Sequence, residues 1–90
     1  MRESKVERAL VDAVEAAGGV CWKWVSPNMR GVPDRVAVLP GGRVVFVELK
    51  APGKRPTPQQ QRRHAELRAR GADVRTVDST DDIAGVLACC

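Results

Sequence analysis

The segment from 31 to 50 constrains the fold of this chain most, because it reads as a β-hairpin with acidic residues at its open end. Residues 35–39 and 44–49 are rich in β-branched side chains, which favour strands. The sequence Pro40-Gly41-Gly42 interrupts this pattern and predicts a turn between them. We therefore expect two neighbouring antiparallel strands.

The length of the turn decides which side chains face each other. With a three-residue loop, Val36 pairs with Phe46 and Asp34 lies opposite Glu48. Lys50 follows Glu48 by two residues, so it falls on the same face. A two-residue turn would shift the register by one residue and separate the carboxylates.

A pair of facing carboxylates could bind a divalent metal and activate water beside a phosphate. Directly opposed side chains have Cβ atoms roughly 4.5–5.5 Å apart, close enough to share a cation. The alternative is an ordinary turn aspartate and a solvated Glu-x-Lys strand end. Val44, Phe46 and Val47 predict a strand buried on both faces, so Glu48 and Lys50 would need partners or a ligand.

Length and charge set outer limits on the protein. Ninety residues predict a single domain, 1–90, with a small core. The net charge of +4 and pI near 9.4 favour an acidic partner such as nucleic acid. No apolar run reaches membrane-spanning length and no signal-peptide pattern is present, so we expect an intracellular protein that does not bind a membrane.

The cysteines do not indicate a zinc site. Cys21 falls in a predicted strand and suits a core position, whereas Cys89 and Cys90 are expected to form a loose tail. There is no Cys-x-x-Cys pattern and His64 is the only histidine. We therefore expect no zinc.

The first helix is predicted over residues 4–17, ending at a pair of glycines. Glu7 lies near its apolar stripe and has two interpretations. It is either a metal ligand or the glutamate of a capping box that begins at Ser4. The stripe itself consists of Val6, Leu10, Ala13, Val14 and Ala17.

The remaining elements complete a small α/β domain. Residues 20–25 predict a strand with Trp22 and Trp24, which are expected in the core, with base-stacking platforms as the alternative. A stiff basic connector over 51–56 precedes a second helix, and residues 74–77 predict a fourth strand parallel to the third. A short helix from Ser79 to Ala88 would follow. The order is αβββαβα, with a mixed four-stranded sheet flanked by helices.

The second helix carries a further polar candidate. Thr57 caps it, Pro58 opens it, and it is expected to run to residue 70. Gln60, His64 and Leu67 share its sheet-facing side. Gln60 is either the last residue of a capping box or a polar group aimed at the carboxylates, and His64 is expected to be packed or half-exposed rather than to act as a base.

This ordered set of residues resembles the VRR-NUC family, the virus-type replication-repair nucleases of the PD-(D/E)XK superfamily, also called restriction-endonuclease-like. The resemblance spans nearly the whole chain, and none of the positions that carry it departs from the family pattern. It rests on Glu7, Ser26-Pro27, Gly31-Val32-Pro33-Asp34, Phe46-Val47-Glu48-Leu49-Lys50 and Thr57-Pro58-x-Gln60.

The resemblance implies a metal-dependent nuclease. Asp34, Glu48 and the backbone carbonyl of Leu49 would ligate Mg²⁺ or Mn²⁺, which prefer oxygen ligands. Glu7 would bind the metal directly or through water. Lys50 would orient and help deprotonate the attacking water or stabilise charge on the phosphorus, and Gln60 would steady the arrangement.

The resemblance also implies a substrate and an assembly. We expect a homodimer that cuts structured DNA, with four-way (Holliday) junctions favoured over flaps or nicks. A DNA-binding subunit that keeps the fold without cutting is the non-enzymatic alternative. The candidate phosphate contacts are Lys23, Arg30, Lys54, Arg55, Arg62 and Arg63.

Overall fold

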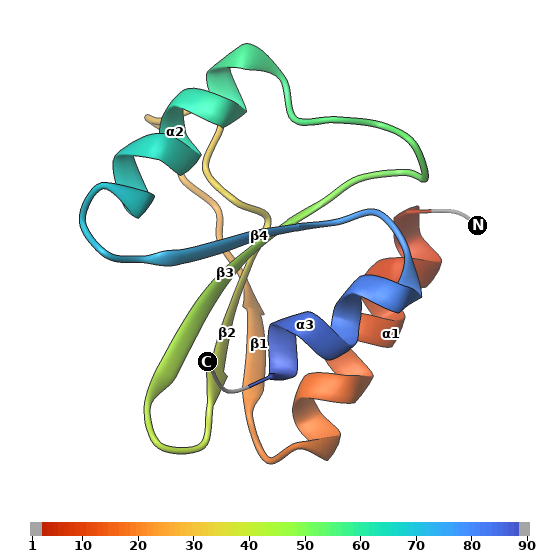
Figure 1. The fold of residues 1–90 in the computed structure, drawn as a ribbon. Helices are drawn as coiled ribbons and strands as arrows, with labels where there is room; N and C mark the ends of the chain where they lie inside the picture. Colours follow the sequence, from red (N-terminus) through yellow and green to blue (C-terminus); the bar gives the residue numbers. More distant parts are fainter. Residues whose placement is uncertain (1–2, 89–90) are drawn as a thin grey trace.

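The computed structural model describes residues 3–88, which form a four-stranded sheet flanked by helices (Figure 1). Cys89 and Cys90, the predicted tail, lie outside the described residues. Within residues 3–88 no helix is long and apolar enough to cross a membrane. The elements in chain order are α1 (Glu3–Ala16), β1 (Val20–Lys23), β2 (Arg35–Leu39), β3 (Arg43–Leu49), α2 (Pro58–Arg68), β4 (Asp73–Val77), the 3-10 helix η1 (Thr80–Asp82) and α3 (Ile83–Leu87).

The sheet has the strand order β1-β2-β3-β4. The first three strands pair antiparallel, and β4 returns through α2 to pair parallel with β3. Val36 pairs with Phe46, as the three-residue turn predicts. Gly41 and Gly42 both have positive φ, of 85° and 81°, which explains why glycines occupy this turn. The predicted fold class, α/β with the order αβββαβα and a mixed sheet, is confirmed.

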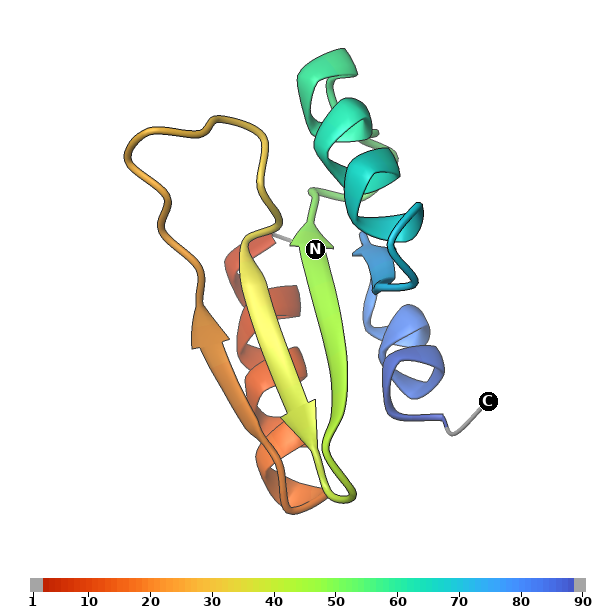
Figure 2. The same ribbon diagram turned by 90° about the vertical axis from the view of Figure 1, so that its left-hand side faces the viewer.

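One face of the sheet is covered by α1 and α3. Figure 2 shows α1 running behind β1, β2 and β3. Three residues of its predicted stripe, Val6, Leu10 and Val14, have no exposed surface. They pack in one core with alternate residues of β3, including Val45 and Val47. Burying each such side chain contributes about 1.5–3 kcal/mol, so this layer provides most of the apolar packing.

The opposite face is largely bare over β1, β2 and β3, and no helix crosses in front of these strands in Figure 2. Trp22 is 65% exposed and Val44 41% exposed, so the prediction of a core Trp22 and of a β3 buried on both faces is wrong at these positions. The reason is that α2 packs against β4 and leaves the other strands uncovered. We call this surface the open face. The register arranges it in two cross-strand rows, Val20–Val38–Val44 and Trp22–Val36–Phe46.

Candidate active site

Asp34 lies immediately before β2 and is fixed there by hydrogen bonds. Its backbone oxygen accepts from the Trp24 amide at 2.9 Å, which extends the β1–β2 pairing by one step. Its Oδ2 accepts from the Leu49 amide at 2.8 Å. Because Arg35 pairs with Val47, the next step along the same register sets Asp34 beside Glu48. The geometry expected from the turn length is therefore present.

Glu48 is the most buried carboxyl group of the cluster, with 1% of its surface exposed. Burial raises its pKa to about 8, helped by the negative charge of Asp34 and a hydrogen bond to the Asp34 carboxyl group, while Lys50 acts in the opposite direction. Its Oε1 is buried without a hydrogen-bond partner among the described residues. A cation between the two carboxylates would relieve both the repulsion and the unsatisfied oxygen.

The donor set fits a hard divalent cation. Two carboxylates meet, and oxygen ligands with several waters are what Mg²⁺ and Mn²⁺ accept. Within residues 3–88 no group of three or more His, Cys, Asp or Glu side chains is placed to hold a metal ion. Ligation by the Leu49 carbonyl stays a prediction.

Lys50 and Gln60 both reach Glu48. The Lys50 Nζ lies 3.5 Å from Oε2, which confirms the expected common face. Gln60 donates from Nε2 to the same oxygen at 3.1 Å. Its Oε1 meanwhile accepts from the Thr57 amide at 2.9 Å, completing a capping box. The two interpretations of Gln60 are therefore compatible, because its two amide atoms serve them separately.

Glu7 is placed apart from this cluster. Its Oε2 accepts from Arg35 Nε at 2.9 Å, and Arg35 also donates to the Cys21 carbonyl at 3.0 Å. Arg35 pairs with Val47 and so faces the α1 side of the sheet, opposite Glu48. Ser4 lies within α1 instead of before it, so the alternative capping box does not form. A metal-binding role for Glu7 stays a prediction.

His64 is the site residue to which sequence reasoning assigned no role. It is 2% exposed, and its Nε2 lies 3.5 Å from Glu48 Oε1. Burial, followed by the charges of Arg68 and Lys50, lowers its pKa, so the ring is neutral at pH 7. The spacing of four residues between Gln60 and His64 was the available signal, because it places both on one helix face.

Most of the predicted DNA-contacting side chains surround this region on exposed segments. Lys54 and Arg55 lie in the connector that leaves β3, and Arg62 lies on the outer side of α2. Lys23 ends β1, where it is exposed. Arg63 is less available, because it bonds the Arg30 carbonyl at 3.2 Å and the Glu66 carboxylate at 2.8 Å.

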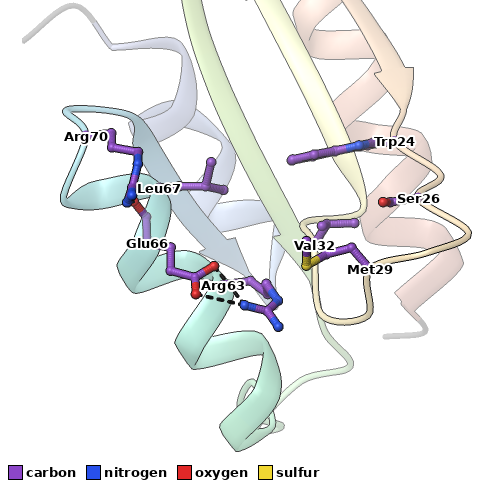
Figure 3. Close-up of a pocket in the computed structure, with 8 residues that line it drawn as sticks. All are labelled: Trp24, Ser26, Met29, Val32, Arg63, Glu66, Leu67 and Arg70. Atoms are coloured by element: carbon purple, nitrogen blue, oxygen red, sulfur yellow. Dashed lines mark hydrogen bonds and ion pairs between the residues drawn. The ribbon is translucent and has the colours of Figure 1, made fainter.

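A separate cavity of about 460 Å³ lies between α2 and the segment joining β1 to β2 (Figure 3). None of the clustered residues Asp34, Glu48 and Lys50 lines it. The segment approaches α2 closely at Gly31, where an added Cβ would lie 2.9 Å from the Gln59 carbonyl oxygen. Its lining residues are Trp24, Ser26, Met29, Val32, Arg63, Glu66, Leu67 and Arg70.

Comparisons with known proteins found related chains, although no family model matches the chain. The chain is 52% identical over 81 residues, 90% of its length and 87% of the other protein, to "Putative nuclease p44" of Acyrthosiphon pisum secondary endosymbiont phage 1. A solved "VRR_NUC domain" has a TM-score of 0.88 and 31% identity, covering 97% of this chain and 96% of that one. A second, "VRR_NUC domain protein", shares the fold with a TM-score of 0.76 and 16% identity, covering 97% and 85%. The chain belongs to the VRR-NUC family.

Proposed function

We propose that this protein is a Mg²⁺- or Mn²⁺-dependent, structure-selective DNA endonuclease that cuts four-way (Holliday) junctions as a homodimer. The observation that carries the proposal is the buried Glu48 carboxyl group beside Asp34, with Lys50 and Gln60 on the same oxygen. A purely structural role would leave two adjacent carboxylates unexplained. The proposed site of action is inside a bacterial or phage-infected cell, where such DNA occurs.

Each residue of the cluster has a distinct task in phosphodiester hydrolysis. Asp34 and Glu48, with the Leu49 carbonyl, would hold the cation. Glu7 is paired with Arg35 and would have to leave that ion pair to reach the cation directly or through water. The bound cation supplies Lewis-acid polarisation of the phosphate and a more acidic water. Lys50 orients that water or stabilises charge developing on the phosphate. Gln60 holds the Glu48 carboxylate, and hydrolysis leaves a 5′-phosphate and a 3′-hydroxyl.

DNA binding would depend on the exposed basic side chains. Lys54 and Arg55 follow directly from the segment that ends at Lys50, so they are near enough in sequence to contact phosphates flanking the scissile bond. Lys23, Arg30, Arg62 and Arg63 extend this positive surface. Such contacts carry affinity and salt dependence rather than base specificity.

The open face supports the homodimer. Its six side chains are Val20, Trp22, Val36, Val38, Val44 and Phe46, and none of them carries a charge. Exposed contiguous apolar surfaces of this kind mark protein interaction sites. A second copy is the proposed partner, because a two-fold axis would cover the same face on both chains and bring together two cutting sites for paired nicks.

Two alternatives are distinguishable. A monomer that prefers flaps or nicks would indicate a less selective nuclease. A protein that binds DNA without cutting would indicate a non-catalytic subunit. Cleavage of duplex, flap and four-way-junction DNA in Mg²⁺ or Mn²⁺ by the wild type and Glu48→Gln separates these functions.

In that assay we expect junction cleavage by the wild type and none by Glu48→Gln or Asp34→Asn, with DNA binding in Ca²⁺ retained by both variants. Lys50→Ala should lower the cleavage rate by about 10²–10⁴-fold, as for loss of a proton-transfer group. Arg8→Ala is the matched control, because Arg8 is an exposed cation on α1 outside the cluster. No cleavage of any substrate by the wild type would contradict the proposal.

A further inference from the structure

We infer that His64 is a positioning residue for Glu48, holding Oε1 through Nε2–H while Gln60 holds Oε2. The inference rests on the proposed metal site and goes beyond it, because it assigns a task to a side chain that would not itself ligate the ion. It concerns the direction in which the Glu48 carboxylate points.

The two atoms concerned face each other in a closed environment. His64 Nε2 and Glu48 Oε1 are 3.5 Å apart, and their side chains are 2% and 1% exposed. Neither atom has a hydrogen-bond partner among the described residues. A buried donor and a buried acceptor left unsatisfied are costly, so a small closure of this gap satisfies both.

The composition of α2 argues against simple packing. His64 is the one fully buried residue of this helix. An apolar side chain could fill the same space without aiming a nitrogen at a carboxylate. Gln60 lies one helical turn earlier on the same face, so the helix presents two donors to Glu48, one for each oxygen.

The arrangement leaves the carboxylate able to bind a cation. An ionised carboxylate has about four lone-pair sites on its two oxygens. Gln60 and His64 each take one site, on different oxygens, and the remaining sites are available to the ion and Lys50. Groups that orient a ligating side chain in this way typically change metal affinity by about 10–100-fold when removed.

The first test measures Mn²⁺ affinity by water-proton relaxation, in the full-length protein without DNA. His64→Leu should weaken Mn²⁺ binding by about 10-fold or more, and His64→Gln, which retains an N–H at similar reach, should recover most of the loss. Leu67→Ala is the matched control, because Leu67 is a sheet-facing residue of α2 that lines the separate cavity. It should lower thermal stability without changing Mn²⁺ affinity.

The outcomes separate this inference from the proposed function. If the wild type does not bind Mn²⁺, the metal site itself fails. If the wild type binds and His64→Leu binds equally well, or His64→Gln rescues nothing, the positioning role is overturned while the metal site stands.

A second test reads His64 directly and needs no metal. The chain contains one histidine, so its ¹⁵N imidazole resonances are unambiguous. At pH 9, where the Glu48 carboxyl group is ionised, we expect hydrogen on Nε2 in the wild type and a changed Nε2 shift in Glu48→Leu, which removes the acceptor. A ring with hydrogen on Nδ1 alone, or an Nε2 shift insensitive to Glu48, would overturn the inference.

Discussion

Among single residues, Glu48 is an acid whose surroundings strongly disfavour its ionised form. It is a nearly fully buried acid whose neighbour, Asp34, is also an acid, and burial is the largest cause of its raised pKa. Lys50 offsets only part of this. The residue is therefore suited to function more than to stability, as buried ionisable groups often are.

Replacing Glu48 should consequently stabilise the metal-free protein. In EDTA at pH 9, above the raised pKa of about 8, Glu48→Gln removes a buried carboxylate and its repulsion with Asp34, so we expect the free energy of unfolding to rise by about 1–3 kcal/mol. Urea unfolding measures this change. Glu66→Gln is the control, because that carboxylate is 51% exposed and its loss should change stability by less than about 0.5 kcal/mol. A destabilised Glu48→Gln would contradict the expectation that burial and repulsion of the carboxylate outweigh its contacts with Lys50 and Gln60.

Asp73 provides the opposite case, an acid whose surroundings favour its charge. Hydrogen bonds from Arg75, with further help from Arg43, lower its pKa below the ordinary value of 3.8. A lowered folded-state pKa contributes stability above the unfolded-state value and loses it as the pH falls through the folded-state value.

We therefore expect Asp73→Asn to be less stable than the wild type at pH 7, with the difference shrinking as the pH falls below 3.8. Thermal unfolding followed from pH 7 to pH 2 tests this. Asp12→Asn is a suitable control. Asp12 is exposed, and its Oδ2 lies 3.9 Å from Arg8 Nε, so this ion pair is long and weak. A pH-independent difference for Asp73→Asn would contradict the assignment.

At the scale of elements, the hairpin could be predicted because its turn and its two strands are adjacent in the sequence. The turn length set the register of Val36 with Phe46, and that register brought Asp34 beside Glu48. The partner of Glu7 could not be predicted in the same way. It required knowing that α1 crosses the face carrying Arg35, which depends on how distant elements pack.

The same distinction explains the errors on the open face. Alternation predicted which side chains share a face, but not whether another layer covers that face. Trp22 and Val44 read as core residues and are exposed, because α2 packs against β4. His64 was placed on the correct side of its helix, but its contact with Glu48 depends on where the helix lies.

The contact between α2 and the segment before β2 depends on Gly31. Its φ is +88°, and an added Cβ would lie 2.9 Å from the Gln59 carbonyl oxygen. Gly31→Ala should therefore destabilise the protein by about 1–3 kcal/mol, through backbone strain and displacement of α2.

Urea unfolding of Gly31→Ala and Gly53→Ala separates the effect of the Gly31–Gln59 contact from that of backbone strain. Gly53 also has a positive φ, of +79°, but an added Cβ there meets no atom within 4 Å. We expect Gly31→Ala to be more destabilising and also to reduce cleavage, since α2 carries Gln60. If Gly31→Ala and Gly53→Ala lower the free energy of unfolding equally, the close approach of Gly31 to Gln59 does not contribute to stability.

For the whole molecule, the distribution of apolar surface is uneven. One side of the sheet is covered by α1 and α3, whereas on the open face Trp22 is 65% exposed. The two cross-strand rows of apolar side chains on this face run over β1, β2 and β3, and no helix lies in front of these strands in Figure 2.

Trp22→Glu should convert the proposed dimer into a monomer, because it would bury a charge within the apolar contact. Sedimentation equilibrium measures the assembly, and circular dichroism checks the fold. Val25→Glu is the control, because Val25 is 77% exposed but lies outside the open face. If the wild type is already monomeric, or Trp22→Glu remains dimeric, this face does not join two copies.

The hydrogen bond from the Leu49 amide to Asp34 joins residues only 15 apart in the chain. Closing so short a loop is fast, and hairpins of this kind form within about 1–10 μs. Asp34 and Glu48 are therefore brought together by the β2–β3 hairpin itself, and a divalent ion bound between them would link its two strands as well as the two carboxylates.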